Sequence, residues 1–179
     1  MIARAILISL IVSASWLEAA AQPAPVLQGE QITESALIEM LAPAPPPILT
    51  RGINPAPTSP PKPTSAALLI TFETNATTLT SAARRELDVV GKALNTSKLG
   101  QFNFVIEGHA DPRGSSQRNQ RLSQGRAEEV RQYLVLNHGV RADRLKAVGK
   151  GDLEPMNQDN PAAPENRRVT FVNNFQAAQ

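Results

Sequence analysis

Asp111 and Arg126 are the two residues in this sequence whose types and positions most need a chemical explanation. On a helix drawn at about 100° per residue, Arg126 falls inside the apolar stripe, between Leu122 and Val130. A guanidinium stays charged, so on the apolar side of a helix it must reach an anion or water. Asp111 ends a strand-like segment and precedes a Gly-containing loop and a helix, where open α/β folds place ligand groups.

If these two side chains converge on one pocket, together they can recognise a zwitterion. The guanidinium can bind a carboxylate through two hydrogen bonds while the aspartate accepts from an ammonium, which selects an amino-acid head group. No bond has to break for this task. Two plainer interpretations stay open: Arg126 packs its stem and sends its head to water or an internal carboxylate, and Asp111 is a turn residue before Pro112.

Other reactive groups are scarce. The chain has no Cys, which excludes disulfides, a thiolate nucleophile and Cys-ligated zinc. His109 is the only imidazole near Asp111, because His138 follows 29 residues later, and His109 with Asp111 offers too few ligands for a metal. Gly149-Lys150 lacks the pattern of a phosphate-binding loop. We therefore expect a structural role for His109 and neither a metal nor a cofactor.

Elements able to position Asp111 and Arg126 follow from periodicity. The second helix is predicted over 119–136, and the first has Leu79, Ala83, Leu87, Val90 and Leu94 on one side after a Thr80 cap. Short apolar runs rich in strand formers predict strands over 67–72, 102–107, 144–148 and 167–172. The order β-α-β-α-β-β predicts an α+β fold, a two-layer sandwich with helices packed on one face of a small mixed sheet.

The first 21 residues have the features of an export signal. A short positive start is followed by the apolar run 5–17 and by the small residues Ala19, Ala20 and Ala21. Thirteen apolar residues are fewer than the roughly 20 that a membrane-spanning helix needs. We expect cleavage near Ala21, no transmembrane segment in the mature chain, and a location outside the cytoplasm.

Proline divides the mature chain into two parts. Of the 15 prolines, 11 lie between Pro23 and Pro63, which predicts a Pro-rich linker over 22–65 and a globular domain over 66–175. Inside the linker, the segment 31–41 has apolar residues at helical spacing. Two interpretations of this segment stay open: a transient amphipathic turn in a tail, or a helix that docks on a partner.

Several separated motifs together resemble one known family. They are GHADPRGSSQRNQRLSQGRAEEVRQYL, preceded by ITFETNATTLTSAARREL and followed by GKGDLEP and NRRV. In order and spacing, over about residues 68–172, they resemble the C-terminal domain of outer-membrane protein A, the OmpA-like peptidoglycan-binding domain. Two departures are Ala110, where the family usually has Thr, and a short loop ahead of Asn166.

The resemblance implies a function and a set of site residues. It implies non-catalytic binding of peptidoglycan through the diaminopimelate of the stem peptide, with Asp111 and Arg126 as the key pair. It also suggests supporting contacts from Asn75, Asn119 and Arg167. The protein would be periplasmic, associated with peptidoglycan and the outer membrane, and its N-terminal segment would meet an outer-membrane or periplasmic partner.

Two functions from other classes are weaker hypotheses. A peptidoglycan-modifying enzyme would use Glu107 and Asp111 as acid and base, but nothing in the sequence indicates separated carboxylates around a water-excluding cleft. A nucleic-acid module is disfavoured by the formal charge of only +2, by the export signal and by the acidic residues of the same helix. The candidate arginines of such a nucleic-acid module are Arg113, Arg118, Arg121 and Arg131. Arg118, Arg121 and Arg131 are predicted to form a solvated helix face.

Overall fold

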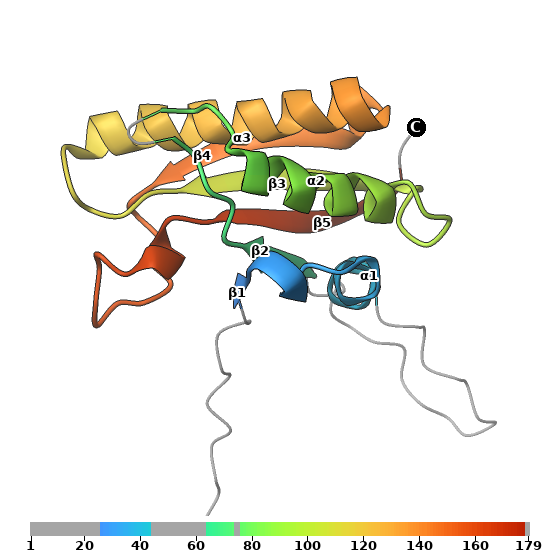
Figure 1. Cartoon of the computed structure of the whole chain (residues 1–179), viewed down its shortest axis with the longest axis horizontal. Coiled ribbons are helices and arrows are strands. Elements are labelled where there is room, and N and C mark those ends of the chain that lie inside the picture. Colours follow the sequence, from blue (N-terminus) through green and yellow to red (C-terminus); the bar gives the residue numbers. More distant parts are fainter. Residues whose placement is uncertain (1–25, 44–63, 74–75, 178–179) are drawn as a thin grey trace, which may run out of the picture.

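The computed structural model describes residues 26–43, 64–73 and 76–177. Its strands and helices (Figure 1) are β1 (Val26–Leu27), α1 (Glu34–Leu41), β2 (Ser65–Leu68), α2 (Ser81–Leu94), β3 (Phe102–His109), α3 (Ser116–His138), β4 (Leu145–Gly151) and β5 (Val169–Ala177). None of these helices combines the length and the apolar character needed to span a bilayer. The export signal expected over 1–21 and most of the Pro-rich segment fall outside the described residues.

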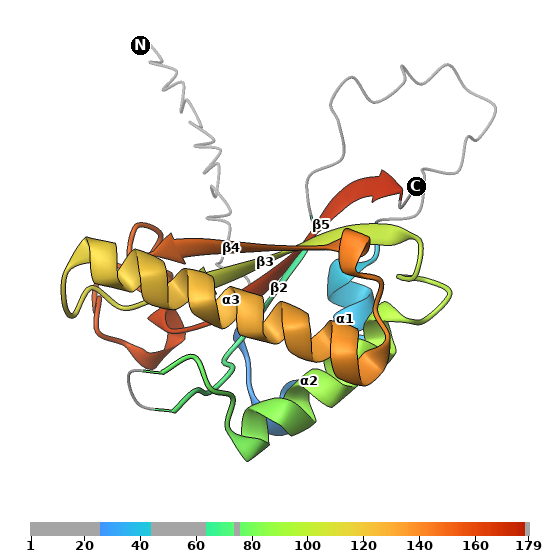
Figure 2. The ribbon, with the colours of Figure 1, turned by 90° about the horizontal axis from the view of Figure 1, so that it is seen from above.

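The five strands form one mixed sheet in the order β1-β2-β5-β3-β4. The central strand β5 is antiparallel to both β2 and β3, whereas β3 and β4 are parallel and are joined through α3. The three helices lie on one side of the sheet (Figure 2). The predicted α+β sandwich is therefore confirmed, with β1 as an additional edge strand.

The first predicted strand is shorter and earlier than the sequence suggests. The apolar run predicts a strand over 67–72, but β2 ends at Leu68, which pairs with the first residue of β5, Val169. Beyond Leu68 the chain has no antiparallel partner, and only an isolated bridge joins Phe72 to Leu79. This turn directs Phe72 toward α3 instead of extending the sheet.

α2 begins at the predicted Thr80 cap, whereas α3 begins three residues before the predicted range of 119–136 and ends two residues after it. The Thr80 hydroxyl accepts from Ala83 N at 3.1 Å, and the Ser115 hydroxyl accepts from Arg118 N at 3.3 Å. Gly139 ends α3 with a φ of 62°, a left-handed conformation that favours glycine. The predicted apolar side of α2 is buried throughout, and it forms a core with Phe104, Ile106 and Phe171 of the sheet and with Ala127, Val130 and Leu134 of α3.

Two glycines allow α3 to approach the sheet closely. Gly108 and Gly149 are register partners on β3 and β4. A Cβ at Gly108 would lie 2.2 Å from the carbonyl oxygen of Ser123, and one at Gly149 would lie 2.5 Å from Gln124 N. Any larger residue would push the helix away, so these glycines set the height of α3 above the strands.

Polar side chains of α3 also form hydrogen bonds with backbone groups on the free edge of β4. Gln120 donates to Gly149 O at 2.7 Å, Gln124 accepts from Gly149 N at 2.6 Å, and Ser123 accepts from Gly151 N at 2.9 Å. Arg131 donates to Leu145 O at 2.8 Å, so the prediction that it belongs to a solvated face is wrong. An edge strand without a neighbour exposes a row of backbone groups, and here α3 satisfies them.

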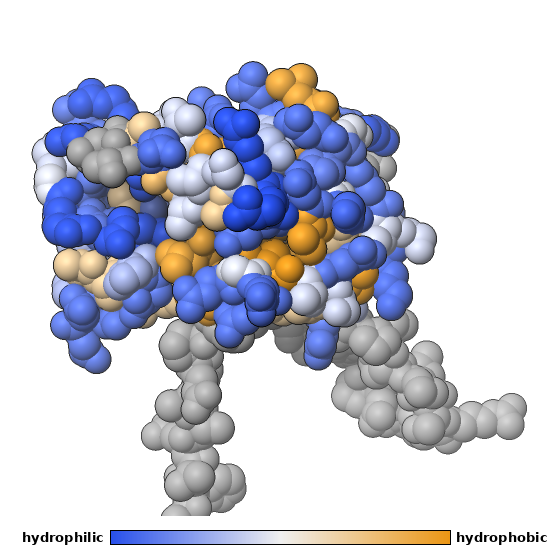
Figure 3. Space-filling model, in the orientation of Figure 1, coloured by the Kyte–Doolittle hydropathy of each residue, from blue (hydrophilic) through white to orange (hydrophobic). Residues whose placement is uncertain are grey.

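Residues 26–43 belong to the globular unit, which corrects the expectation of a linker for this described part of 22–65. β1 pairs in parallel with β2, and α1 has Leu37 and Leu41 fully buried in the core. The carbonyl of Leu41 accepts from Asn173 Nδ2 and from Thr64 Oγ1, each at 2.9 Å. An eight-residue helix is marginal alone, so this packing is what stabilises it. On the face of the molecule shown in Figure 3, apolar surface gathers between α2 and the elements β1 and α1.

His109 is a buried histidine on the sheet face that carries no helix. Gly108 faces α3, so Glu107 and His109 point to the opposite face. The imidazole is 3% exposed, and neither ring nitrogen has a hydrogen-bond partner within the described residues. Burial is the main cause that lowers its pKa from 6.5 to about 4; the cations Arg168 and Lys150 add to this, and Glu154 opposes it. His109 is therefore neutral at pH 7.

Replacement of Leu37 tests whether α1 belongs to the core. We expect Leu37→Ala to lower the free energy of unfolding by about 2–5 kcal/mol, because it removes buried methyl groups and leaves a cavity. Chemical denaturation measures this change. Glu39→Ala, on the exposed side of the same helix, is the matched control and should have little effect. Equal stabilities of the two variants would contradict the assignment.

The buried imidazole predicts a loss of stability in mild acid. The unfolded chain binds a proton at His109 below about pH 6.5, whereas the folded protein binds one only near pH 4, so protons favour unfolding. The free energy of unfolding should fall between those pH values by up to about 3 kcal/mol. His109→Gln should show a shallower dependence between about pH 7 and about pH 5, and equal slopes would contradict this prediction.

Candidate functional site

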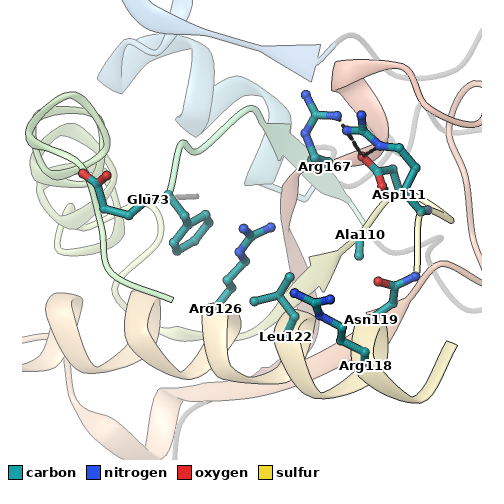
Figure 4. Close-up of a pocket in the computed structure, with 10 residues that line it drawn as sticks. Glu73, Ala110, Asp111, Arg118, Asn119, Leu122, Arg126 and Arg167 are labelled. Carbon is teal, nitrogen blue, oxygen red and sulfur yellow. Dashed lines mark hydrogen bonds and ion pairs between the residues drawn. The ribbon is translucent and has the colours of Figure 1, made fainter. Parts of the chain in front are cut away.

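A pocket of about 450 Å³ opens beside the N-terminal half of α3, at the end of β3. The chain around Phe72, the loop after β3, α3 and Arg167 just before β5 all contribute to its walls (Figure 4). The residues that line it are Phe72, Glu73, Ala110, Asp111, Arg113, Arg118, Asn119, Leu122, Arg126 and Arg167. Most are polar or charged, and four of them are arginines.

Asp111 is a buried, ionised carboxylate at one wall. It is 6% exposed and accepts from Arg113 Nη2 at 2.6 Å and from Arg167 Nη1 at 2.8 Å. Hydrogen bonding from Arg113 is the main cause that lowers its pKa to about 2; burial opposes this shift, and Arg167 reinforces it. Arg113 N also donates to Asp111 Oδ1 at 3.2 Å, so Asp111 serves as a turn residue as well.

Arg126 reaches the pocket from α3 without a carboxylate partner within the described residues. Its Nε donates to Ala76 O at 3.2 Å, and its Cζ lies 4.8 Å from the centre of the Phe72 ring. Its two terminal nitrogens make no hydrogen bond in the described part of the chain. Burial first, and then the nearby Arg167, lower its pKa, while Asp111 opposes this shift. A half-buried guanidinium of this kind is suited to bind an anion.

Asp111 and Arg126 line the same pocket and do not form an ion pair with each other. Asp111 is bound by Arg113 and Arg167, and Arg126 is bound by a backbone carbonyl and an aromatic ring. The pocket stays open between them (Figure 4). The plainer interpretation, in which Arg126 pairs with an internal carboxylate, does not describe this arrangement.

The three supporting residues that the sequence suggested have different positions. Asn119 is buried in the pocket wall and donates to Asp152 Oδ2 at 3.0 Å. Arg167 is half-buried and bonded to Asp111, where it helps to hold the carboxylate. Asn75 lies outside the described residues.

Arg113 and Arg118 are pocket residues that the sequence analysis did not assign to the site. Arg118 is exposed, as predicted for the solvated face of the helix, and its side chain also lines the pocket beside Asn119 (Figure 4). Angular position around the helix does not show this, because a long side chain near the end of a helix can extend to a neighbouring loop. For Arg113, the two-residue spacing from Asp111, typical of an Asx turn, was the available signal.

Glu107 does not share this pocket, which weakens its proposed role as a catalytic partner of Asp111. It lies on the opposite face of the sheet with His109 and Glu154, and one ligand atom from each lies within 4.8 Å of the others. These three could in principle hold a metal, but Lys150 Nζ already contacts both carboxylates, at 3.3 Å and 3.0 Å. The lysine supplies the positive charge that a cation would bring.

Comparisons with known proteins identify relatives of this domain. The peptidoglycan-associated lipoprotein of Pseudomonas aeruginosa is 40% identical over 100 residues, which cover 55% of this chain and 57% of that protein. The chain therefore spans a little more than half the length of this curated relative.

Solved structures share the fold over a similar part of the chain. The peptidoglycan-associated lipoprotein from Burkholderia pseudomallei matches with a TM-score of 0.50 and 29% identity, over 58% of this chain and 87% of that one. The cell wall anchor of the T6SS from Pseudomonas aeruginosa matches with a TM-score of 0.52 and 25% identity, over 62% and 80%.

A family model extends the same assignment to the pocket itself. It is the model of the OmpA family, and it matches residues 71–168. This range covers more than half of the chain and contains every residue that lines the pocket, from Phe72 to Arg167. In sequence, in fold and over the whole of its candidate site, the chain belongs to the OmpA family.

Proposed function

We propose that this domain binds peptidoglycan without catalysis, through the diaminopimelate of the stem peptide, and so anchors the protein or a partner to the cell wall. One observation carries the proposal: an open pocket has an ionised carboxylate, Asp111, on one wall and on another a guanidinium, Arg126, that has no carboxylate partner among the described residues. The free end of diaminopimelate has an ammonium and a carboxylate on one carbon atom, so it offers the opposite charges.

In this proposal each charge of the ligand has a defined partner. Arg126 donates its two terminal N–H groups to the ligand carboxylate, while Phe72 and Ala76 hold the guanidinium in place. Asp111 accepts from the ligand ammonium. The side chain of Arg113 is 66% exposed, so it can leave Asp111 at little cost when the ammonium arrives. Arg167 stays bound to Asp111 and keeps the carboxylate in position.

The relatives support this ligand class and a location at the cell wall. One is named for its association with peptidoglycan, and another is described as a cell wall anchor. With the expected export signal over 1–21, these names support a periplasmic protein at the cell wall, and other relatives named as outer membrane proteins support an association with that membrane. The apolar side of α1 is buried against its own domain, so a partner would have to bind another surface.

The key pair can be tested by pull-down of the full mature chain with purified sacculi. Arg126→Ala and Asp111→Asn should each weaken binding by about tenfold or more, because each removes a charge-assisted contact. Arg121→Ala is the matched control, since Arg121 is exposed on the same helix and does not line the pocket. If both pocket variants remain folded and bind like the control, the assigned site is wrong.

The ligand class can be tested with two stem peptides that differ at one residue. Replacing diaminopimelate by lysine keeps the ammonium and removes the neighbouring carboxylate, which leaves Arg126 without its proposed partner. We expect titration calorimetry to show affinity for the lysine peptide lower by about tenfold or more. Equal affinities for the two peptides would show that Arg126 does not bind the head-group carboxylate.

A further inference from the structure

The pocket has more positive charge than a zwitterionic head group can balance. Arg113, Arg118, Arg126 and Arg167 line it together with only two carboxylates, Asp111 and Glu73. A head group with one ammonium and one carboxylate has no net charge, so it leaves this excess unchanged. Arginines gathered around one pocket favour a ligand with additional negative charge.

We infer that the pocket binds a second carboxylate of the same stem peptide, and that Arg118 is the residue that holds it. This inference rests on the proposed function, because it adds a second contact to the same ligand. It makes Arg118 a specificity-determining residue, which distinguishes stem peptides by the state of a carboxyl group outside diaminopimelate.

Arg118 is the arginine of the pocket that is free for this role. Arg113 and Arg167 are bound to Asp111, and Arg126 is assigned to the head group. The guanidinium of Arg118 makes no hydrogen bond or ion pair within the described residues; only its backbone N–H is bonded, to Ser115 Oγ. Its side chain lies along the pocket beside Asn119 and Leu122 (Figure 4).

The position of Arg118 is held by the fold. Two of the next five residues, Gln120 and Ser123, are bonded to β4, and Asn119 is bonded to Asp152. The backbone next to Arg118 is therefore held by these bonds, while the arginine side chain is exposed. A ligand carboxylate would order that side chain without any change in the backbone.

The distance between Arg118 and Arg126 suits an extended peptide. Eight residues along α3 separate the Cα atoms by about 12 Å, and both side chains reach into one pocket. A peptide of three residues spans up to about 10 Å, so a ligand held at Arg126 can bring another carboxylate to Arg118. A stem peptide has two such groups: the α-carboxylate of the γ-linked glutamate and the carboxylate of a terminal D-alanine.

Matched peptides test the inference and distinguish the two carboxylates. The first pair is L-Ala-γ-D-Glu-diaminopimelate with the main-chain carboxyl of diaminopimelate amidated and the glutamate α-carboxyl free or amidated, and the second pair adds D-alanine with its carboxyl free or amidated. Titration calorimetry on the full mature chain should show that amidation of the contacted carboxyl weakens binding about tenfold. Amidation of the other carboxyl should have little effect, and this identifies the group that Arg118 binds.

The variant Arg118→Gln tests whether Arg118 is the residue that binds this carboxylate. This variant should bind the free-carboxylate peptide about as weakly as the wild type binds the amidated one, and amidation should cost it nothing more. Arg121→Gln, on the exposed side of α3, should behave like the wild type.

Two results overturn the inference and have different meanings for the proposed function. If the wild type binds all four peptides equally, or if Arg118→Gln keeps the preference, then Arg118 binds no second carboxylate, while diaminopimelate binding stands. If the wild type binds none of the peptides and Asp111→Asn has no effect on sacculi, then both proposals fail.

Discussion

A guanidinium that lies on the apolar side of a helix is the constraint on which the site depends. Arg126 cannot lose its charge at neutral pH, and burial makes that charge costly unless polar groups surround it. In the described part of the chain it contacts a backbone carbonyl and an aromatic face but no carboxylate. Asp111, which lines the same pocket, forms ion pairs with two other arginines. The positive charge of Arg126 therefore stays available to a ligand.

The close approach of α3 to the sheet fixes the position of this charge. Gly108 and Gly149 remove the side chains that would hold the helix away, and polar groups of α3 bond to the free edge of β4. One helix therefore protects the edge of the sheet and forms a wall of the pocket. The polar residues that face β4 make α3 less clearly amphipathic, and they are there because they bond to the edge of the sheet.

The two faces of the sheet separate two groups of ionisable residues. The helix side ends in the pocket with Asp111, whereas the opposite side has the buried His109 near Glu107, Lys150 and Arg168. This second group balances its own charges, since Lys150 contacts two carboxylates. Glu107 lies within β3, whereas β3 ends at His109 and Asp111 belongs to the loop beyond it, so strand alternation no longer sets the direction of Asp111 and the two carboxylates do not line one pocket.

Local pattern was enough to predict the two long helices, the Thr80 cap of α2, the approximate positions of four strands and the α+β class. These features depend on residues near each other in the chain, as in the Thr80 cap. Only the tertiary structure decided that α1 belongs to the core, that Arg131 satisfies β4, and that Arg113 and Arg118 line the pocket. Each of these depends on a contact between segments or on the reach of a long side chain, as between Leu41 and Asn173, 132 residues apart. Periodicity measures the angle of a residue around its own helix, whereas the packing partner of that residue is set by the rest of the fold.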